Sequence, residues 1–251
     1  MDILLKDKFI QQWGRFFGKA ELPITFYYTK EPCDTELADI PAGWSCVIAQ
    51  LAKVRKGKSL AFNADSVTCG GGKRYLAFSN TMRPGFEYFL SCGNAEIEGE
   101  RYLQSPELVK NFMANMPTEI QTDSYIVFKR WDNLTELDKP DVVIFFATPD
   151  VISGLFTLAN FDQSEPNGTI TPFGAGCSSI VHYPYKESKS ARQRAVIGMF
   201  DPSARPCVGE NILTFAVPIK RFESMVKNME ESFLATATWS KIKNRIDRCN
   251  P

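Results

Sequence analysis

Apolar side chains recur at helical spacing along much of the chain. Near the N-terminus Leu5, Phe9, Trp13 and Phe17 follow one another at four-residue steps, which predicts an amphipathic helix over residues 2–18. Glycine, proline and capping residues delimit the other stretches of this kind. They predict helices over residues 47–56, 84–92, 105–114 and 148–160, and a mostly helical stretch over 219–248 that breaks near 235–238.

Runs of β-branched and aromatic residues between polar flanks predict strands. The clearest is 142–146, a continuous apolar run typical of a strand buried on both faces. The others span residues 24–28, 59–63, 75–78, 124–130, 194–199 and 213–217. Taken together, these elements predict an α+β protein, with a mixed sheet flanked by helices.

The order of these elements occurs twice, which indicates an internal duplication. The matching segments are 23–32 with 141–150, Cys46 with Cys177, and 65–78 with 201–215. We therefore expect one compact unit over residues 1–251, built from two similar halves around a pseudo-twofold axis. Its parts are the halves 20–80 and 138–218, a helical connector 84–122 and C-terminal helices 219–248.

The composition narrows the classes of protein. Lys plus Arg equals Asp plus Glu at 29 each, whereas a nucleic-acid binder usually carries a basic excess, so we expect no nucleic-acid partner. The apolar run Val142–Ala147 is too short to cross a bilayer, and the N-terminus lacks a signal-peptide pattern. We expect a cytoplasmic protein without a membrane partner, in which seven cysteines stay reduced.

Two segments combine cysteine with glycine, and they are the leading candidates for a site between the halves. Three consecutive glycines after Cys69 predict a loop with positive φ or a close backbone approach. Cys177 follows a second small-residue segment and is expected to open a helix, where a thiol pKa is lowered. The leading hypothesis is an Fe–S cluster or another thiolate-bound metal, with a redox-related role. Its ligands would be Cys46, Cys69 and Cys177, with Cys207 or Cys92 as the fourth.

Other interpretations stay open. Without a metal, the loops could hold an anionic small molecule through backbone N–H groups and an arginine. The residues proposed for that ligand are Gly70, Gly71, Gly72, Gly176, Asp201 and Arg205.

A nucleophilic cysteine would need a base, and His182 is the only histidine. Two further alternatives are a regulatory role through the C-terminal helices and simple packing of buried thiols.

Two familiar motifs are missing. No CxxC pair supports the metal hypothesis, and Arg74 stands where a phosphate loop requires a hydroxyl group. Neither the substrate nor the oligomeric state follows from these patterns.

The segments 46–62, 68–78, 174–181 and 213–225 together resemble an uncharacterised prokaryotic family, domain of unknown function 169, also labelled ArCR. The resemblance extends from about Phe9 to Arg245. It implies a bacterial or archaeal cytosolic protein but no reaction. The residues that match the family's cysteine–glycine signature are Cys46, Cys69, Gly71, Gly72 and Cys177.

Overall fold

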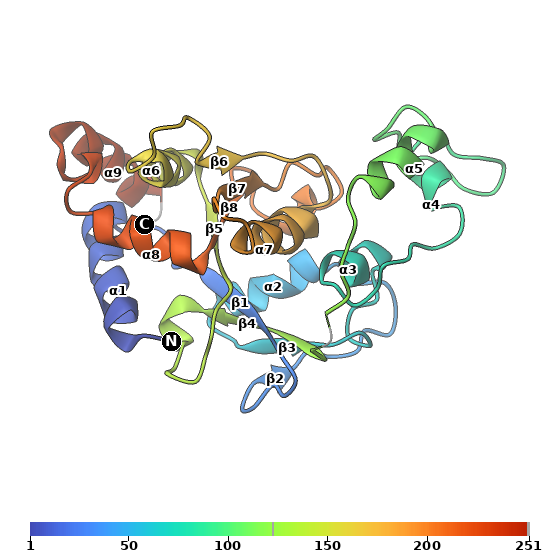
Figure 1. Cartoon of the computed structure of the whole chain (residues 1–251), viewed down its shortest axis with the longest axis horizontal. Helices are drawn as coiled ribbons and strands as arrows, with labels where there is room; N and C mark the ends of the chain where they lie inside the picture. Colours follow the sequence, from blue (N-terminus) through green and yellow to red (C-terminus); the bar gives the residue numbers. More distant parts are fainter. Residues whose placement is uncertain (122, 250–251) are drawn as a thin grey trace.

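The computed structural model describes residues 1–121 and 123–249. Thr122, which ends the predicted connector, and residues 250–251 lie outside the described residues. One eight-stranded mixed sheet forms the centre of this part of the chain, in the order β2-β3-β4-β1-β5-β8-β7-β6 (Figure 1). The strands are β1 (Ile24–Thr29), β2 (Glu36–Leu37), β3 (Leu60–Phe62), β4 (Tyr125–Arg130), β5 (Val142–Ala147), β6 (Thr169–Ile170), β7 (Ala195–Gly198) and β8 (Leu213–Pro218).

The pairing pattern is the same on both sides of the sheet's centre. Strands β1 and β5 pair antiparallel in the middle. Outward from β1, the sheet continues with antiparallel β4, antiparallel β3 and parallel β2. Outward from β5, it continues with antiparallel β8, antiparallel β7 and parallel β6. The predicted α+β class with a mixed sheet is therefore confirmed, while the duplication itself stays a prediction.

Helices cover both faces of the sheet, and those on each face contribute to a separate core. Helices α1, α6, α8 and α9 contribute to one core, whereas α2, α3, the π-helical segment η2 and α7 contribute to the other. Their bounds are α1 (Ile3–Phe17), α2 (Val47–Arg55), α3 (Gly70–Tyr75), α6 (Pro149–Asn160), η2 (Ser178–His182), α7 (Tyr183–Ser188), α8 (Ile219–Asn228) and α9 (Ala237–Cys249). Three short helical turns complete this part: η1 (Trp131–Asn133), η3 (Arg205–Cys207) and η4 (Phe233–Ala235).

Strand β5 shows how the sheet separates the two cores. Val143 and Phe145 belong to the first core, and Ile144 and Phe146 to the second. Because side chains alternate along a strand, a continuous apolar run supplies both faces at once. This is why the run is apolar throughout, as the sequence predicted.

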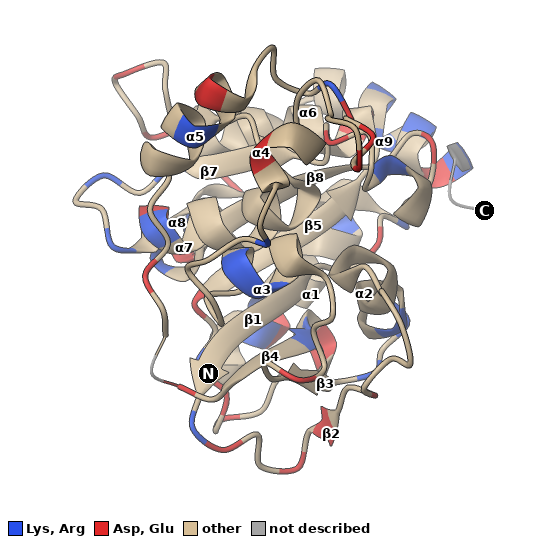
Figure 2. Ribbon diagram, turned by 90° about the vertical axis from the view of Figure 1, so that its right-hand side faces the viewer, with Lys and Arg blue, Asp and Glu red and all other residues tan. Residues whose placement is uncertain are grey.

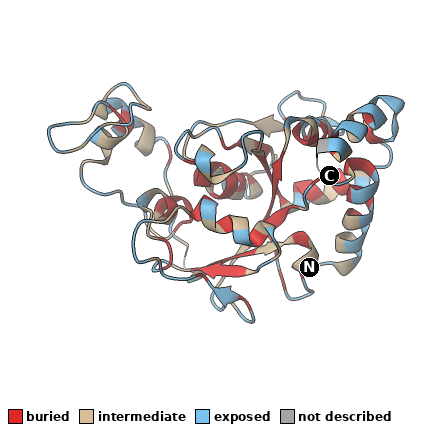
Figure 3. Cartoon of the chain, turned by 180° about the vertical axis from the view of Figure 1, so that it is seen from behind, coloured by how far each residue is buried: buried red, intermediate tan, exposed pale blue. Residues whose placement is uncertain are grey.

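A lobe formed by residues 79–121 extends away from the sheet. It carries α4 (Phe86–Phe89) and α5 (Pro106–Ala114), and it lies to the right of the body in Figure 1. Figure 3 shows that most of its ribbon is exposed or half-buried, in contrast to the buried sheet. Ser105 caps α5 by accepting a hydrogen bond from the N–H of Leu108, as its sequence position predicted.

Three local predictions are wrong. Residues 75–78 are not a strand but the end of α3 and the turn after it, and β4 occupies the place that corresponds to β8. Residues 70–72 form the first turn of α3 instead of a loop with positive φ. The helix expected over 84–92 is the single turn α4, where Gly85 adopts a left-handed conformation.

No helix within the described residues is long and apolar enough to span a membrane. Figure 2 shows Lys and Arg interspersed with Asp and Glu over the ribbon. The equal numbers of positive and negative side chains in the sequence are thus spread over many elements and not separated into regions of one charge.

Candidate functional site

The two candidate cysteines of the first half, Cys46 and Cys69, begin two neighbouring helices. Cys46 is the N-cap residue of α2, and Cys69 is the N-cap residue of α3. The Sγ atom of Cys69 accepts a hydrogen bond from the N–H of Gly72 at 3.5 Å. A Cβ atom on Gly72 would lie only 3.2 Å from a methyl carbon of Val47, so glycine allows α3 to approach α2 closely.

The cysteines of the second half occupy corresponding places in the topology. Cys177 lies in the first helical turn before η2, so the expectation that it opens a helix is confirmed. Cys207 ends the turn η3, in the connection between β7 and β8. Asp201 joins these two segments, because its Oδ2 accepts a hydrogen bond from the N–H of Gly176 at 2.9 Å. An added Cβ on Gly176 would lie 2.7 Å from the Cβ of Ala204, so only glycine permits this contact.

Electrostatic effects link the candidate cysteines in three pairs: Cys69 with Cys177, Cys46 with Cys177, and Cys207 with Cys46. Burial raises the pKa of Cys177 well above its usual value, and Cys69 and Cys46 raise it further. Cys46, Cys177 and Cys207 also contribute to the same apolar core. That these cysteines from distant segments share one site stays a prediction.

The thiol groups of Cys46 and Cys177 are protonated at neutral pH, because the pKa of each is raised. Burial raises the pKa of Cys46 to about 11, with an additional contribution from Cys207. The backbone N–H groups of Ala49 and Ile48 act in the opposite direction. The expected lowering of the Cys177 pKa at a helix start is wrong, because desolvation outweighs the helix effect.

The remaining candidate for a fourth ligand lies elsewhere. Cys92 is exposed in the loop after α4, where its Sγ contacts the carbonyl oxygen of Gly93 at 3.5 Å. Cys207 is thus the better fourth member of the group. Within residues 1–121 and 123–249, no group of three or more His, Cys, Asp or Glu side chains is already arranged to hold a metal ion.

Three of the groups predicted to bind an anion, the N–H groups of Gly72 and Gly176 and the Arg205 side chain, already have intramolecular partners. Arg205 donates hydrogen bonds to the carbonyl oxygens of Ile212, Gly209 and Glu210, and so braces its own loop. The N–H of Gly176 is bonded to Asp201. These contacts favour a structural role for Arg205 and Asp201.

His182 is half-buried against aromatic rings and is not suited to act as a base. Burial lowers its pKa to about 4, with smaller contributions from Lys186 and Arg74. Its ring lies 6.0 Å from that of Tyr75 and 5.2 Å from that of Tyr183, both edge-on. His182 is not among the groups that perturb the pKa of Cys177. The structure therefore does not support a Cys177–His182 catalytic pair.

The lobe adds residues that the sequence patterns did not indicate. Ser203 and Asp201 both affect the pKa of Tyr102, so the Tyr102 side chain lies beside the Asp201 loop. Phe112 of α5 packs edge-on against Phe173, with ring centroids 5.7 Å apart. The lobe therefore covers the segments that lead to Cys177 and Cys207. Nothing in the sequence of residues 79–121 indicates these contacts, because they join segments far apart in the chain.

Comparison with known proteins identifies the family. A sequence profile of DUF169, described as uncharacterised ArCR, matches residues 17–228, well over half of the chain. The chain belongs to the DUF169 family. No curated protein and no solved structure matches it. Residues 17–228 include Cys46, Cys69, Cys177 and Cys207 as well as the lobe, so all of these lie within the part of the chain that matches the DUF169 profile.

Proposed function

We propose that this DUF169 protein binds an Fe–S cluster or another thiophilic metal at Cys46, Cys69, Cys177 and Cys207. The observation that supports the proposal is that four cysteines from four separate segments, two from each half of the sheet, are linked pairwise: Cys69 and Cys46 raise the pKa of Cys177, and Cys207 raises that of Cys46. Thiolates are the usual ligands of clusters and of structural zinc. A cluster would supply one-electron chemistry, and it would then require a redox partner or a reducible small molecule.

The surroundings of the thiols fit such a group in two respects. The N–H of Gly72 is directed at Cys69, and hydrogen bonds to sulfur tune bound clusters. Cys46, Cys69, Cys177 and Cys207 are free thiols, so none of them is withheld from a metal by a disulfide. Since no ligand set is arranged in advance among the described residues, binding would reorient side chains and displace the thiol protons.

Metal analysis of the full chain tests the proposal. The protein is produced with iron available, purified without oxygen, and analysed for iron, zinc, acid-labile sulfide and visible absorption. The test variants are Cys46→Ala, Cys69→Ala, Cys177→Ala and Cys207→Ala. The matched controls are Cys33→Ala and Cys92→Ala, because both of these cysteines are exposed.

We expect the wild-type protein and both controls to contain metal, and each test variant to lose most of it. Circular dichroism shows whether a variant remains folded. Metal-free wild-type protein would refute the proposal, as would metal that survives all four substitutions in folded protein.

A further inference from the structure

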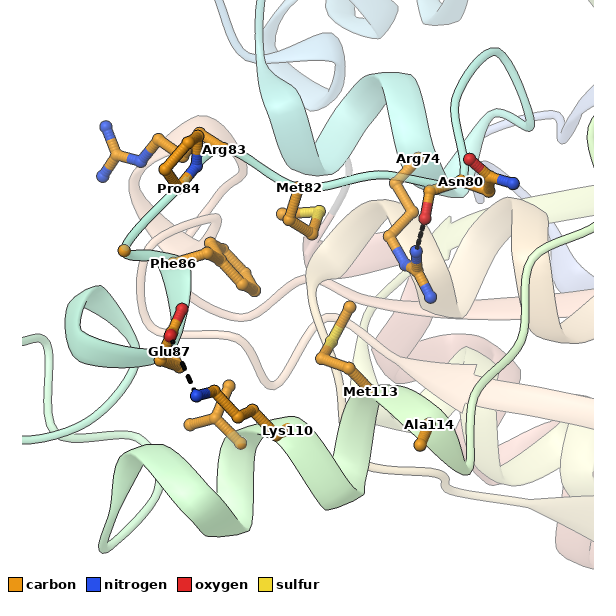
Figure 4. Close-up of a pocket in the computed structure, with 12 residues that line it drawn as sticks. Arg74, Asn80, Met82, Arg83, Pro84, Phe86, Glu87, Lys110, Met113 and Ala114 are labelled. Atoms are coloured by element: carbon orange, nitrogen blue, oxygen red, sulfur yellow. Dashed lines mark hydrogen bonds and ion pairs between the residues drawn. The ribbon is translucent and has the colours of Figure 1, made fainter.

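A cavity of about 650 Å³ lies between the lobe and the body of the molecule (Figure 4). Its walls come from the end of α3, residues 80–87 and α5. Small-molecule sites typically enclose about 300–1,000 Å³, so the size is suitable. None of the residues predicted from the sequence to bind a ligand lines this cavity.

Arg74 supplies the positive charge on the side of the cavity that adjoins the body. The residue is only 6% exposed. One terminal nitrogen donates a hydrogen bond to the carbonyl oxygen of Asn80, and the other donates to that of Met116 at 2.9 Å. The Nε–H group has no partner. The hydrogen-bonding partners of this buried cation are therefore neutral, and an anion would compensate its charge.

The remaining walls are mainly apolar. Met82, Phe86 and Met113 face one another across the cavity in Figure 4. At its outer edge Arg83 stacks on Phe89, with the guanidinium carbon 4.7 Å from the ring centroid. Lys110 is paired with Glu87 at 3.3 Å. The cavity thus offers a buried cation and an apolar wall with thioether and aromatic surfaces.

We infer that this cavity binds a small organic anion with an apolar body. The anionic group is held by Arg74, and the apolar body packs against Met82, Phe86 and Met113. A charge-assisted hydrogen bond of Nε–H completes the donor set of the guanidinium. The inference is independent of the proposed metal site, although α3 carries both Cys69 at its start and Arg74 in its last turn.

A pair of fluorescent probes tests the inference on the full chain. Anilinonaphthalene sulfonate has an apolar body, a naphthalene joined through an amine to a phenyl ring, and one anionic group. Phenylnaphthylamine has the same body without the charge. We expect saturable binding of the sulfonate to one site, at least about tenfold tighter than binding of the neutral probe. Arg74→Gln should weaken sulfonate binding by about tenfold or more and leave the neutral probe unaffected.

Because Arg74 also bonds two backbone carbonyls, a second variant keeps the test valid if Arg74→Gln does not fold. Ala114→Glu places a carboxylate on the cavity wall from an exposed position of α5. Asn111→Glu makes a similar change on an exposed part of α5 that does not line the cavity. We expect the first to lose sulfonate binding and the second to retain it.

Three results would overturn the inference: no saturable sulfonate binding, equal affinity for both probes, or equal sulfonate binding by the Ala114→Glu and Asn111→Glu variants. Metal content is measured on the same samples. Loss of probe binding with intact metal, or the reverse, shows which of the two proposed sites has failed.

Discussion

Two glycines in helices should respond in opposite ways to substitution by alanine. An alanine Cβ at Gly154 in α6 would lie 2.3 Å from a ring carbon of Trp239 and 2.9 Å from one of Phe17. The Trp239 ring is fixed, since its Nε1–H donates a hydrogen bond to the carbonyl oxygen of Phe16 at 2.7 Å. At Gly14 in α1, by contrast, an added Cβ would meet nothing within 4 Å.

Helix propensity and packing determine the two magnitudes. Alanine is favoured over glycine inside a helix by about 1 kcal/mol, so Gly14→Ala should stabilise the protein by roughly 0.5–1 kcal/mol. Gly154→Ala gains the same propensity but overpacks a core, which costs about 1–3 kcal/mol or more. Because the displaced atoms belong to an anchored ring, we expect the upper end and a net loss of about 2 kcal/mol.

Urea unfolding followed by circular dichroism measures both free energies of unfolding. Thermal melts provide a second readout, with a decrease of roughly 4–8 °C expected for Gly154→Ala from the usual scaling with chain length. The reasoning fails if Gly154→Ala is as stable as Gly14→Ala, since the close packing of α6 on α9 would then be absent. A Gly14→Ala variant less stable than wild type would refute the assigned helix α1 at that position.

Three further predictions concern titratable groups. Burial raises the pKa of Asp141 to about 6, so its ionisation lowers the free energy of unfolding as pH rises through that value. At pH 7.5 the Asp141→Asn variant should therefore unfold at a higher urea concentration than wild type. This advantage should vanish towards pH 4, where the carboxyl group of Asp141 is protonated in the folded protein. Burial lowers the pKa of His182 to about 4, so as pH falls below 6.5 the unfolded chain binds a proton at His182 before the folded chain does. The free energy of unfolding of the wild type should therefore fall between pH 6.5 and 4. His182→Gln should gain stability relative to wild type over that range in the same urea titrations. In metal-free protein at pH 8, iodoacetamide followed by mass spectrometry should label the exposed Cys33 and Cys92 well before Cys177, and equal rates would contradict the burial of Cys177.

Much of the fold could be predicted because its long elements have local signals. The four-residue steps from Leu5 to Phe17 and the apolar run of β5 indicate their structures within a few turns or residues. The short strands β2 and β6 have two residues each and were not predicted. Strands of that length contain too few side chains to show any period, so only their partners β3 and β7 define them.

Helix α3 shows why local signals fail near the site. Three glycines disfavour a helix by propensity, and the apolar residues 75–78 fit a strand equally well. Contacts from outside the segment decide the structure: Gly72 packs against Val67 and Val47, and the Cys69 thiol caps the helix. Likewise, the neutral partners of Arg74 are visible only in three dimensions, because they come from Asn80 and Met116.

The two sides of the sheet differ most in one connection, and that difference bears on function. Between β7 and β8 the chain needs only residues 199–212, which contain Asp201 and Cys207. Between β3 and β4 it uses residues 63–124, which contain Cys69, the lobe and the Arg74 cavity. Features shared by both sides, such as a cysteine in each connection, supply the ligands of the proposed metal site. The lobe is present only in the β3–β4 connection. The sheet does not require it, since the shorter β7–β8 connection joins two strands in the corresponding places of the sheet. The lobe is therefore better explained by a ligand that it helps to enclose than by a demand of the fold.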